Sequence, residues 1–342
     1  RRRSIGVTTT ISFAPLYRAR GPTPRSDPAQ IRSALNPTPG ALRWDERERL
    51  RRPLSLFDTP GLPEGRWVEL PGRGVTYVRE ADGPADAPTV LLLHGWTANS
   101  ALNWFGTFGP LSEMFHVVAV DHRGHGRGIR SWRRFTLEDC ADDAAALLRV
   151  LGVGSAVAVG YSMGGPVAQL LWRRHPALVD GLVLCATAAR FRDTRGERAV
   201  RGVVTGLSFA TLATPTWMHR RLAERVLVSK YDTSPLGTWA REQARQNDLR
   251  AMIDAGHALG AFDSREWVGS IDVPTAIVMT RFDTTVLTSR QQDLADAIPG
   301  ATTWSVNGGH DVCAVDPETF VPVLLDACTD VASRTGAPTT RP

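Results

Sequence analysis

The chain has 342 residues, a net charge of +5 and a mean hydropathy of -0.16, values that are ordinary for a soluble globular protein. At about 150 residues per domain, this length allows two domains or one large α/β domain with an insertion. No run of about eighteen apolar residues occurs, which argues against a membrane-spanning protein. The four cysteines are far apart in the sequence and match no zinc-binding or redox spacing, so we expect no metal site and no cofactor.

The N-terminal region differs in composition from the rest of the chain. Residues 1–60 contain eight of the 23 prolines, and residues 1–53 carry twelve arginines against four acidic residues, which leaves the remainder mildly acidic. This composition predicts a Pro- and Arg-rich arm over residues 1–60 rather than a domain. We expect no nucleic-acid partner and keep contact of the arm with an anionic membrane surface as a hypothesis. The expected location is cytoplasmic or peripheral to a membrane, with an upstream targeting sequence left open.

Short apolar runs follow the arm and indicate β-strands. The runs at 67–70 and 75–78 flank a Pro-Gly-Arg-Gly turn and predict a hairpin. The later runs are continuously apolar, which is typical of strands buried on both faces of a mostly parallel sheet. These runs occupy residues 89–93, 117–120, 156–159, 182–186 and 276–279, and a further strand-like run covers 302–306.

Helices are predicted between the strand-like runs. Thr136 followed by Asp139 is typical of a helix-capping pair, and so is Thr288 followed by Gln291. Asp316 directly before a proline is a further helix-start signal. The alternation of strands and helices predicts an α/β fold with helices on both faces of the sheet.

Residues 188–270 interrupt this alternation. The stretch has a helical pattern, is rich in arginine and contains no run that would form a buried strand. It therefore predicts a helical cap inserted into the fold. The α/β core then comprises residues 61–187 and 271–342.

The most specific motif is Gly160-Tyr161-Ser162-Met163-Gly164, which follows an apolar run and precedes a helical stretch. Strand, GxSxG and helix in this order are the context of a nucleophile elbow. The turn is so tight that the residues two positions away from the serine must be small. We therefore expect the Ser162 hydroxyl to be exposed at the end of a strand, next to a helix N-terminus that favours negative charge.

A serine hydroxyl becomes a nucleophile when a base removes its proton and a carboxylate orients that base. His310 lies in a glycine-rich loop after the last strand-like run, and Asp283 follows the run at 276–279. Both are expected at the same edge of the sheet as Ser162, so we predict His310 as the base and Asp283 as the orienting acid. Asp193 is a weaker candidate for the acid.

The oxyanion that forms during acyl transfer needs two backbone N–H donors. The elbow assigns one of these donors to Met163. The second is predicted from the loop after the run at 89–93, where the next free amide after the turn His94-Gly95 belongs to Trp96. His94 itself is expected to form the turn by hydrogen bonding within its loop.

Together these motifs resemble the α/β-hydrolase superfamily, specifically its cap-bearing esterase, lipase and lactonase branch. The resemblance covers residues 66–335 and implies an eight-stranded sheet, a Ser162, Asp283 and His310 triad, and oxyanion donors at Trp96 and Met163. The stretch Asp121-His122-Arg123-Gly124-His125-Gly126 is similar to the DxRGxG turn of the family, which is usually structural. The two histidines in this turn are not expected to bind a metal.

A serine at the elbow points to acyl transfer and argues against the superfamily members that use a carboxylate nucleophile. We predict a serine hydrolase that cleaves a small-molecule carboxylic ester through an acyl-enzyme. Hydrolysis of a lactone, a thioester or a C–C bond and haloperoxidase-like perhydrolysis use the same residues and stay open, as does the oligomeric state. A ligand-binding receptor with little turnover is the alternative from another class. Residues of the cap are expected to contact the substrate or to form the core of the cap itself: Trp217, Met218, Leu236, Trp239, Met252 and Phe262.

Overall fold

The computed structural model describes residues 62–191 and 235–335. The predicted arm over residues 1–60 lies outside these ranges, as do the candidate residues Asp193, Trp217 and Met218. Contact of the arm with a membrane therefore stays a prediction. No helix within the two described ranges combines the length and the apolar character that a membrane span requires.

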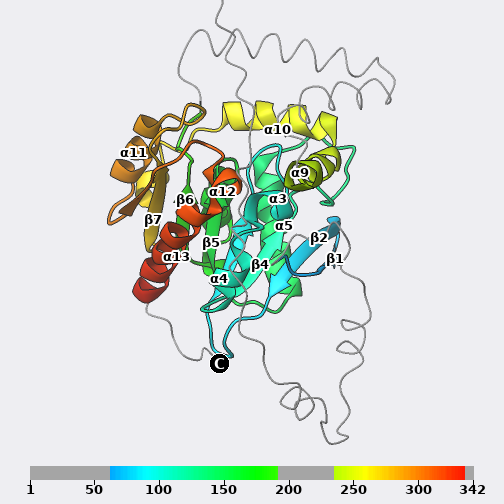
Figure 1. Ribbon diagram of the computed structural model, residues 1–342, viewed down its shortest axis with the longest axis horizontal. Helices are drawn as coiled ribbons and strands as arrows, with labels where there is room; N and C mark the ends of the chain where they lie inside the picture. The colour runs from blue at the N-terminus through cyan, green and yellow to red at the C-terminus, as the bar shows by residue number, and fades with distance from the viewer. Residues whose placement is uncertain (1–61, 192–234, 336–342) are drawn as a thin grey trace, which may run out of the picture.

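One eight-stranded sheet forms the centre of the described part of the chain (Figure 1). Its strands are β1 (Gly65–Leu70), β2 (Gly74–Ala81), β3 (Thr89–Leu93), β4 (His116–Val120), β5 (Ala156–Tyr161), β6 (Val179–Cys185), β7 (Thr275–Thr280) and β8 (Thr302–Val306). Their order in space is β1-β2-β4-β3-β5-β6-β7-β8. Strand β2 runs antiparallel to both of its neighbours, and the other neighbouring pairs are parallel. The predicted eight-stranded, mostly parallel sheet is confirmed.

The sheet separates two hydrophobic cores, because successive side chains of a strand point to opposite faces. In β3, Leu91 and Leu93 belong to one core, whereas Val90 and Leu92 belong to the other. All four side chains are fully buried. Burial on both faces explains why the central strands are continuously apolar instead of alternating with polar residues.

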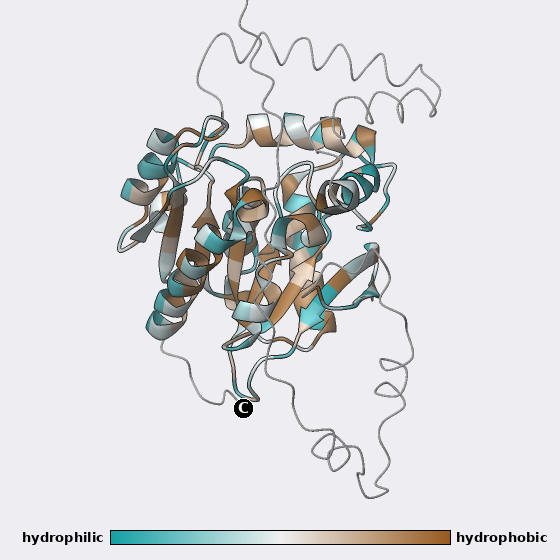
Figure 2. Cartoon of the chain, in the orientation of Figure 1, coloured by the Kyte–Doolittle hydropathy of each residue, from teal (hydrophilic) through white to brown (hydrophobic). Residues whose placement is uncertain are grey.

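Helices cover both faces of the sheet. On one face pack α5 (Leu137–Val150) and α6 (Gly164–Arg174), and on the other pack α4 (Phe108–Ser112) and α13 (Pro317–Arg334). The central strands are brown in Figure 2, whereas teal residues lie on the outer side of α13. The remaining described helices are α3 (Ser100–Trp104), η1 (Pro176–Leu178), α9 (Pro235–Arg245), α10 (Leu249–Ala261), η3 (Val268–Ser270), α11 (Thr288–Ala297) and α12 (Val312–Val315).

Two of the predicted helix starts are confirmed. The Thr136 hydroxyl accepts a hydrogen bond from the Asp139 N–H at 3.0 Å at the start of α5. The Asp316 carboxylate accepts one from the Thr319 N–H at 3.2 Å at the start of α13. Each cap satisfies a backbone N–H that has no partner inside its own helix.

The predicted capping pair of Thr288 and Gln291 is wrong. Thr288 is itself the first residue of α11, and its hydroxyl donates to the Thr280 carbonyl at 2.9 Å. Gln291 does not reach back to the helix start but is fully buried beneath the end of β7. A buried amide must find hydrogen-bond partners in the interior, and the polar groups at this strand end provide them.

The chain between β6 and β7 leaves the sheet. Strand β6 ends at Cys185 rather than at the predicted Ala186, because Ala186 has a φ of 47° in the left-handed region. Within the described residues this connection contains α9, α10 and η3, and its strand-like pairing is limited to a bridge between Arg190 and Asp263. Helix α10 lies across the top of the molecule in the view of Figure 1. This helical content supports the cap predicted over residues 188–270, whose boundaries stay a prediction.

Candidate active site

Ser162 occupies the turn between β5 and α6. Its φ of 51° lies in the left-handed region, which is strained for a residue other than glycine. Two hydrogen bonds hold this backbone: the Ser162 N–H donates to the Cys185 carbonyl at 2.9 Å, and the Thr187 hydroxyl donates to the Ser162 carbonyl at 2.8 Å. A Cβ on Gly160 would lie 2.3 Å from the Gly164 carbonyl oxygen, so the turn has no space for a larger residue there. The geometry presents the serine at the carboxyl end of β5.

His310 lies between Ser162 and Asp283. Its Nε2 is 2.9 Å from the Ser162 Oγ, and its Nδ1 is 2.8 Å from the Asp283 Oδ2. The Tyr161 hydroxyl donates to the His310 carbonyl at 2.8 Å and holds the loop after β8 next to β5. The side chain of Asp283 is fully buried, whereas that of His310 is 23% exposed. The structure therefore brings the three candidate side chains, from the ends of three strands, into one chain of hydrogen bonds.

The Asp283 carboxylate accepts several hydrogen bonds besides that of His310. Its Oδ1 accepts from the N–H groups of Thr285 and Val286, both at 2.8 Å. Its Oδ2 accepts from the Thr280 hydroxyl at 2.8 Å. Burial by itself raises the pKa of Asp283, but the hydrogen bonds and charge supplied by His310 and Thr280 bring that pKa below its ordinary value. The group is therefore ionised near neutral pH and can stabilise a positive charge on the imidazole.

Gln291 supports this carboxylate, and the sequence interpretation missed that role. Its Nε2 donates to Asp283 Oδ2 at 3.2 Å, to the Thr280 hydroxyl oxygen at 2.9 Å and to the Val286 carbonyl at 2.8 Å. Its Oε1 accepts from the Thr280 N–H at 3.0 Å. One sequence feature could have revealed this role: a polar residue on the face of α11 that packs toward the sheet. An amide that is buried there needs several hydrogen-bond partners.

The loop after β3 and the start of α6 lie beside Ser162. A Cβ on Gly95 would lie 3.4 Å from the Ser162 Cβ, and Trp96 is the next residue of that loop. Met163 is fully buried at the N-terminal end of α6, where the helix dipole favours negative charge. Within the described ranges, neither the Trp96 N–H nor the Met163 N–H donates a hydrogen bond to another residue. The two amides that the sequence assigns to an oxyanion hole therefore have no acceptor among the described residues.

Of the predicted substrate contacts that lie within the described residues, Trp239 and Met252 are buried, whereas Leu236 and Phe262 are partly buried. Trp239 is 7% exposed and forms a T-shaped pair with Phe105, at 5.6 Å between ring centroids. Met252 is 2% exposed, and its carbonyl accepts a hydrogen bond from the Trp96 indole at 2.8 Å. Trp239 packs as a core residue in this arrangement, which is one of the two alternatives that the sequence left open. Contact of either side chain with substrate stays a prediction.

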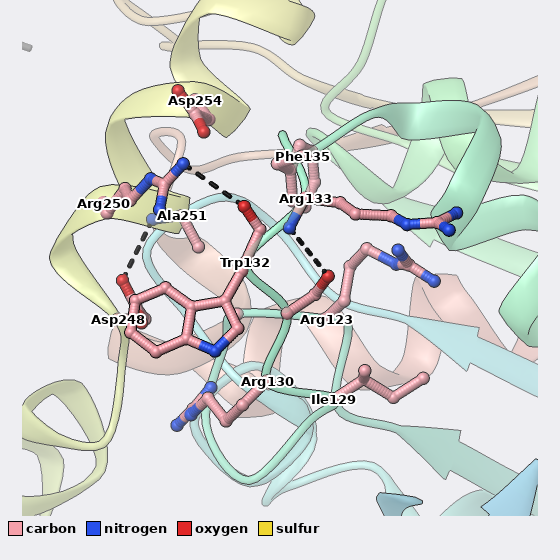
Figure 3. Close-up of a pocket in the computed structure, with 12 residues that line it drawn as sticks. Arg123, Ile129, Arg130, Trp132, Arg133, Phe135, Asp248, Arg250, Ala251 and Asp254 are labelled. Carbon is pink, nitrogen blue, oxygen red and sulfur yellow. Dashed lines mark hydrogen bonds between the residues drawn. The ribbon is translucent and has the colours of Figure 1, made fainter. Parts of the chain in front are cut away.

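A cavity of ≈ 180 Å³ lies between the chain that follows β4 and the start of α10 (Figure 3). Trp132, which is 92% exposed, and Arg250 contribute to its wall, and the Arg250 guanidinium donates to the Trp132 carbonyl at 3.3 Å. None of Ser162, Asp283 and His310 lines this cavity. It is therefore distinct from the candidate active site.

His94, the first residue of the loop after β3, lies beside two other buried histidines, His122 and His125. The ring of His94 is 4.3 Å from that of His122 and 5.3 Å from that of His125, measured between centroids. The His94 Nε2 accepts from the His122 N–H at 3.0 Å, so the His94 Nδ1 carries the proton and donates to the Gly95 carbonyl at 2.8 Å. This hydrogen bond within the loop confirms the turn-forming role expected of His94. In the part of the chain that the structure describes, no group of three His, Cys, Asp or Glu side chains has a metal-binding arrangement.

Comparison with known proteins identifies the family. The sequence matches the family described as alpha/beta hydrolase fold over residues 88–317, which is more than half of the chain. The chain belongs to the alpha/beta hydrolase fold family. Over 253 residues, this α/β hydrolase is 30% identical to the "Putative carbamate hydrolase RutD" of Agrobacterium fabrum, a match that spans 70% of this chain and 93% of that protein. A shorter match of 104 residues, 42% identical, relates it to the "Bifunctional esterase/perhydrolase DCH" of Acinetobacter calcoaceticus and covers 30% of this chain and 37% of that protein.

Solved structures show the same fold. The enol-lactonase from Burkholderia xenovorans superposes with a TM-score of 0.60 at 25% identity and covers 77% of this α/β hydrolase and 100% of its own chain. The esterase from Exiguobacterium antarcticum superposes with a TM-score of 0.64 at 22% identity, covering 78% of this chain and 100% of that chain. By its family, this protein is a hydrolase.

Proposed function

We propose that this α/β hydrolase cleaves carboxylic esters of small molecules through an acyl-enzyme, with Ser162 as nucleophile, His310 as general base and Asp283 as the orienting acid. The observation that carries the proposal is the continuous chain of hydrogen bonds from the Ser162 Oγ through His310 to Asp283. Activation of a serine requires a base within hydrogen-bond reach and a third group that orients the base. The distances in this chain, 2.9 and 2.8 Å, meet both requirements.

In the proposed reaction, the Ser162 Oγ attacks the ester carbonyl carbon while its proton passes to the His310 Nε2. The carbonyl oxygen becomes negatively charged and accepts hydrogen bonds from the N–H groups of Trp96 and Met163. When the tetrahedral intermediate collapses, the bond to the alkoxide breaks and His310 gives its proton to the departing oxygen. Water then attacks the acyl-enzyme by the same sequence of proton transfers, which releases the carboxylic acid and restores the serine. Asp283 stays ionised throughout and stabilises the imidazolium.

Carbamate hydrolysis is a second candidate. The relative described as a carbamate hydrolase matches most of the length of both proteins, whereas the match to the esterase/perhydrolase is closer but much shorter. A carbamate presents a carbonyl carbon to the same nucleophile, so the residues named above apply to either bond. We place esters first because the match to the esterase/perhydrolase has the higher identity, 42% against 30%.

The test is a substrate panel with the purified full chain and with Ser162→Ala. The panel comprises p-nitrophenyl esters of short and long acids, a lactone, a thioester and an N-substituted carbamate. We expect the esters to be turned over fastest and the Ser162→Ala change to lower kcat by at least about 10⁴-fold, because the nucleophile is lost. A fluorophosphonate probe is expected to label wild type at Ser162 and to leave the variant unlabelled.

Circular dichroism and the melting temperature serve as controls for the fold of the variant. Fastest turnover of the carbamate would reverse the order of the two candidates. Turnover that persists in a folded Ser162→Ala protein would contradict the proposal. Ligand binding without turnover of any panel member would favour the receptor alternative.

A further inference from the structure

The loop that follows β3 is held from two sides. Its first half is attached to the core: the Gly95 N–H donates to the Asn103 Oδ1 at 2.9 Å, and the Gly95 carbonyl accepts from His94 at 2.8 Å. Asn103 lies on α3 and is 4% exposed, so this attachment is internal to the α/β core. These contacts hold the residue just before the proposed oxyanion donor Trp96.

The second half of the loop is attached to α10 and to the turn before it. The Trp96 indole N–H donates to the Met252 carbonyl at 2.8 Å. The indole also packs against α10, because a Cβ on Gly256 would lie 2.9 Å from the Trp96 Cζ2. One residue further along, the Thr97 carbonyl accepts from the side-chain amide of Asn247 at 2.9 Å. The conformation of residues 96 and 97 therefore depends on the segment between β6 and β7.

Thr97 needs such a restraint because its backbone is strained. Its φ of 64° lies in the left-handed region, where a β-branched residue is a genuine outlier. Trp96 and Thr97 occupy the two central positions of a turn that the Ala98 N–H closes on the Gly95 carbonyl at 3.4 Å. Glycine or asparagine is the usual residue where the third position of a turn has a positive φ. The strain persists only while neighbouring groups hold the residue in place.

The Asn247 amide has a defined orientation. Its Oδ1 accepts from the Gly126 N–H at 2.7 Å, in the turn after β4, and its Nδ2 donates to the Thr97 carbonyl at 2.9 Å. A carboxamide is the side chain that can accept on one side and donate on the other in this geometry. Asn247 therefore joins the loops after β3 and β4, although it lies 150 residues after Thr97 in the sequence.

We propose that Asn247 is a positioning residue for the oxyanion hole: by holding the Thr97 carbonyl, it keeps the loop in its strained conformation and so maintains the turn that carries the Trp96 N–H. The inference rests on the proposed function, since it concerns the stabilisation of the tetrahedral intermediate. Asn247 does not contact the reacting atoms in this account. Its effect reaches them through the peptide units of Thr97 and Trp96.

The decisive variant is Asn247→Asp, which keeps the shape and the acceptor for Gly126 but replaces the donor to Thr97 with a repulsive oxygen. We expect kcat for a p-nitrophenyl ester to fall between about tenfold and hundredfold, with KM changed less than about twofold, because a misdirected oxyanion donor affects the transition state more than the ground state. Inhibition by a trifluoromethyl ketone, whose adduct carries the oxyanion, should weaken by a similar factor.

The matched control is Gln246→Glu, the same change from amide to acid at the preceding position, where the side chain makes no hydrogen bond to the described residues. We expect this control to retain the kcat of wild type. Melting temperatures of both variants separate a local effect from loss of the fold.

A second variant tests the role of strain directly. Glycine adopts a φ of 64° without steric cost, so Thr97→Gly is expected to retain most of the activity. In the Thr97→Gly background, Asn247→Asp should then reduce kcat less than it does in wild type, because the loop no longer needs the same restraint.

The outcomes separate the two proposals. If Ser162→Ala abolishes turnover but Asn247→Asp leaves kcat within twofold of Gln246→Glu, the inference about Asn247 is wrong and the proposed function stands. If the loss caused by Asn247→Asp is the same with threonine and with glycine at position 97, the strain argument is wrong. If Ser162→Ala has no effect on turnover, the proposed function itself fails.

Discussion

At the scale of single residues, the environment of Asp283 sets the state of the candidate base. The carboxylate side chain is fully buried and accepts hydrogen bonds from backbone and side-chain donors in addition to His310. An ionised carboxylate in this position keeps the proton of the imidazole on Nδ1, so that Nε2 is free to accept the serine proton. The hydrogen-bond donors around Asp283 therefore keep its carboxylate ionised and also fix the orientation of the His310 imidazole.

The substitution Asp283→Asn tests this role. The new amide can donate toward the His310 Nδ1, which would shift the imidazole proton to Nε2 and remove the acceptor for Ser162. We expect kcat to fall by about 10⁴-fold. The melting temperature should also fall, because the buried amide nitrogen cannot accept the hydrogen bonds that Asp283 accepts from Thr280 and Gln291. Measured ester turnover above one tenth of the wild-type value would show that Asp283 does not orient the base.

At the scale of elements, the contact between α6 and β3 decides how closely the elbow approaches the loop after β3. A Cβ on Gly164, the first residue of α6, would lie 2.0 Å from the Leu93 carbonyl oxygen and 3.0 Å from that of His94. The helix and the strand can approach this closely because glycine has no side chain. The same closeness brings the start of α6 to the end of β3, where the proposed oxyanion loop begins.

Gly164→Ala is therefore expected to force α6 away from β3 and to lower the free energy of unfolding by about 2–3 kcal/mol, as overpacked interiors do. Gly109→Ala is the matched control: Gly109 lies in α4, and an added Cβ there has no atom within 4 Å. Alanine is favoured over glycine in a helix, so this control should be neutral or stabilise by up to about 1 kcal/mol. Urea unfolding of both variants provides the measurement, and equal stabilities would contradict the packing argument.

At the scale of the whole molecule, the buried histidines make stability depend on pH. Burial lowers the pKa of His94, and burial together with the neighbouring histidines lowers those of His122 and His125. All three are neutral in the folded protein at neutral pH, whereas in the unfolded chain they bind protons below about pH 6.5. Because the unfolded state binds more protons there, stability is complete above this pH and is lost as the pH falls.

We expect the free energy of unfolding to decrease from pH 7 toward pH 5, with a slope approaching about 4 kcal/mol per pH unit when all three histidines contribute. The carboxylates with lowered pKa values, Asp142, Asp263 and Asp283, add their effect only below about pH 4. The ring nitrogens of His122 have no hydrogen-bond partner among the described residues, so His122→Leu should remain folded and reduce this slope by about one third. Urea titrations at several pH values give the slope, and a flat profile between pH 7 and pH 5 would contradict the prediction.

Local patterns in the sequence were sufficient to predict most of the sheet and the candidates for the site. Continuous apolar runs mark strands that are buried on both faces, and the residues directly after them lie at the edge where parallel strands end. For this reason Ser162, Asp283 and His310 could be selected from the sequence, although their catalytic roles stay a prediction. The helix start at Thr136 was predictable because the capping contact spans only three residues.

Tertiary packing decided what the local patterns could not. Gln291 has the spacing of a capping residue, but burial under the end of β7 directs its amide to Thr280 and Asp283 instead. Asn247 has no motif around it, and its partner Thr97 lies 150 residues earlier in the chain. A hydrogen bond between such distant residues forms only when the folded elements place donor and acceptor within about 3 Å, and no periodicity in the sequence encodes that distance.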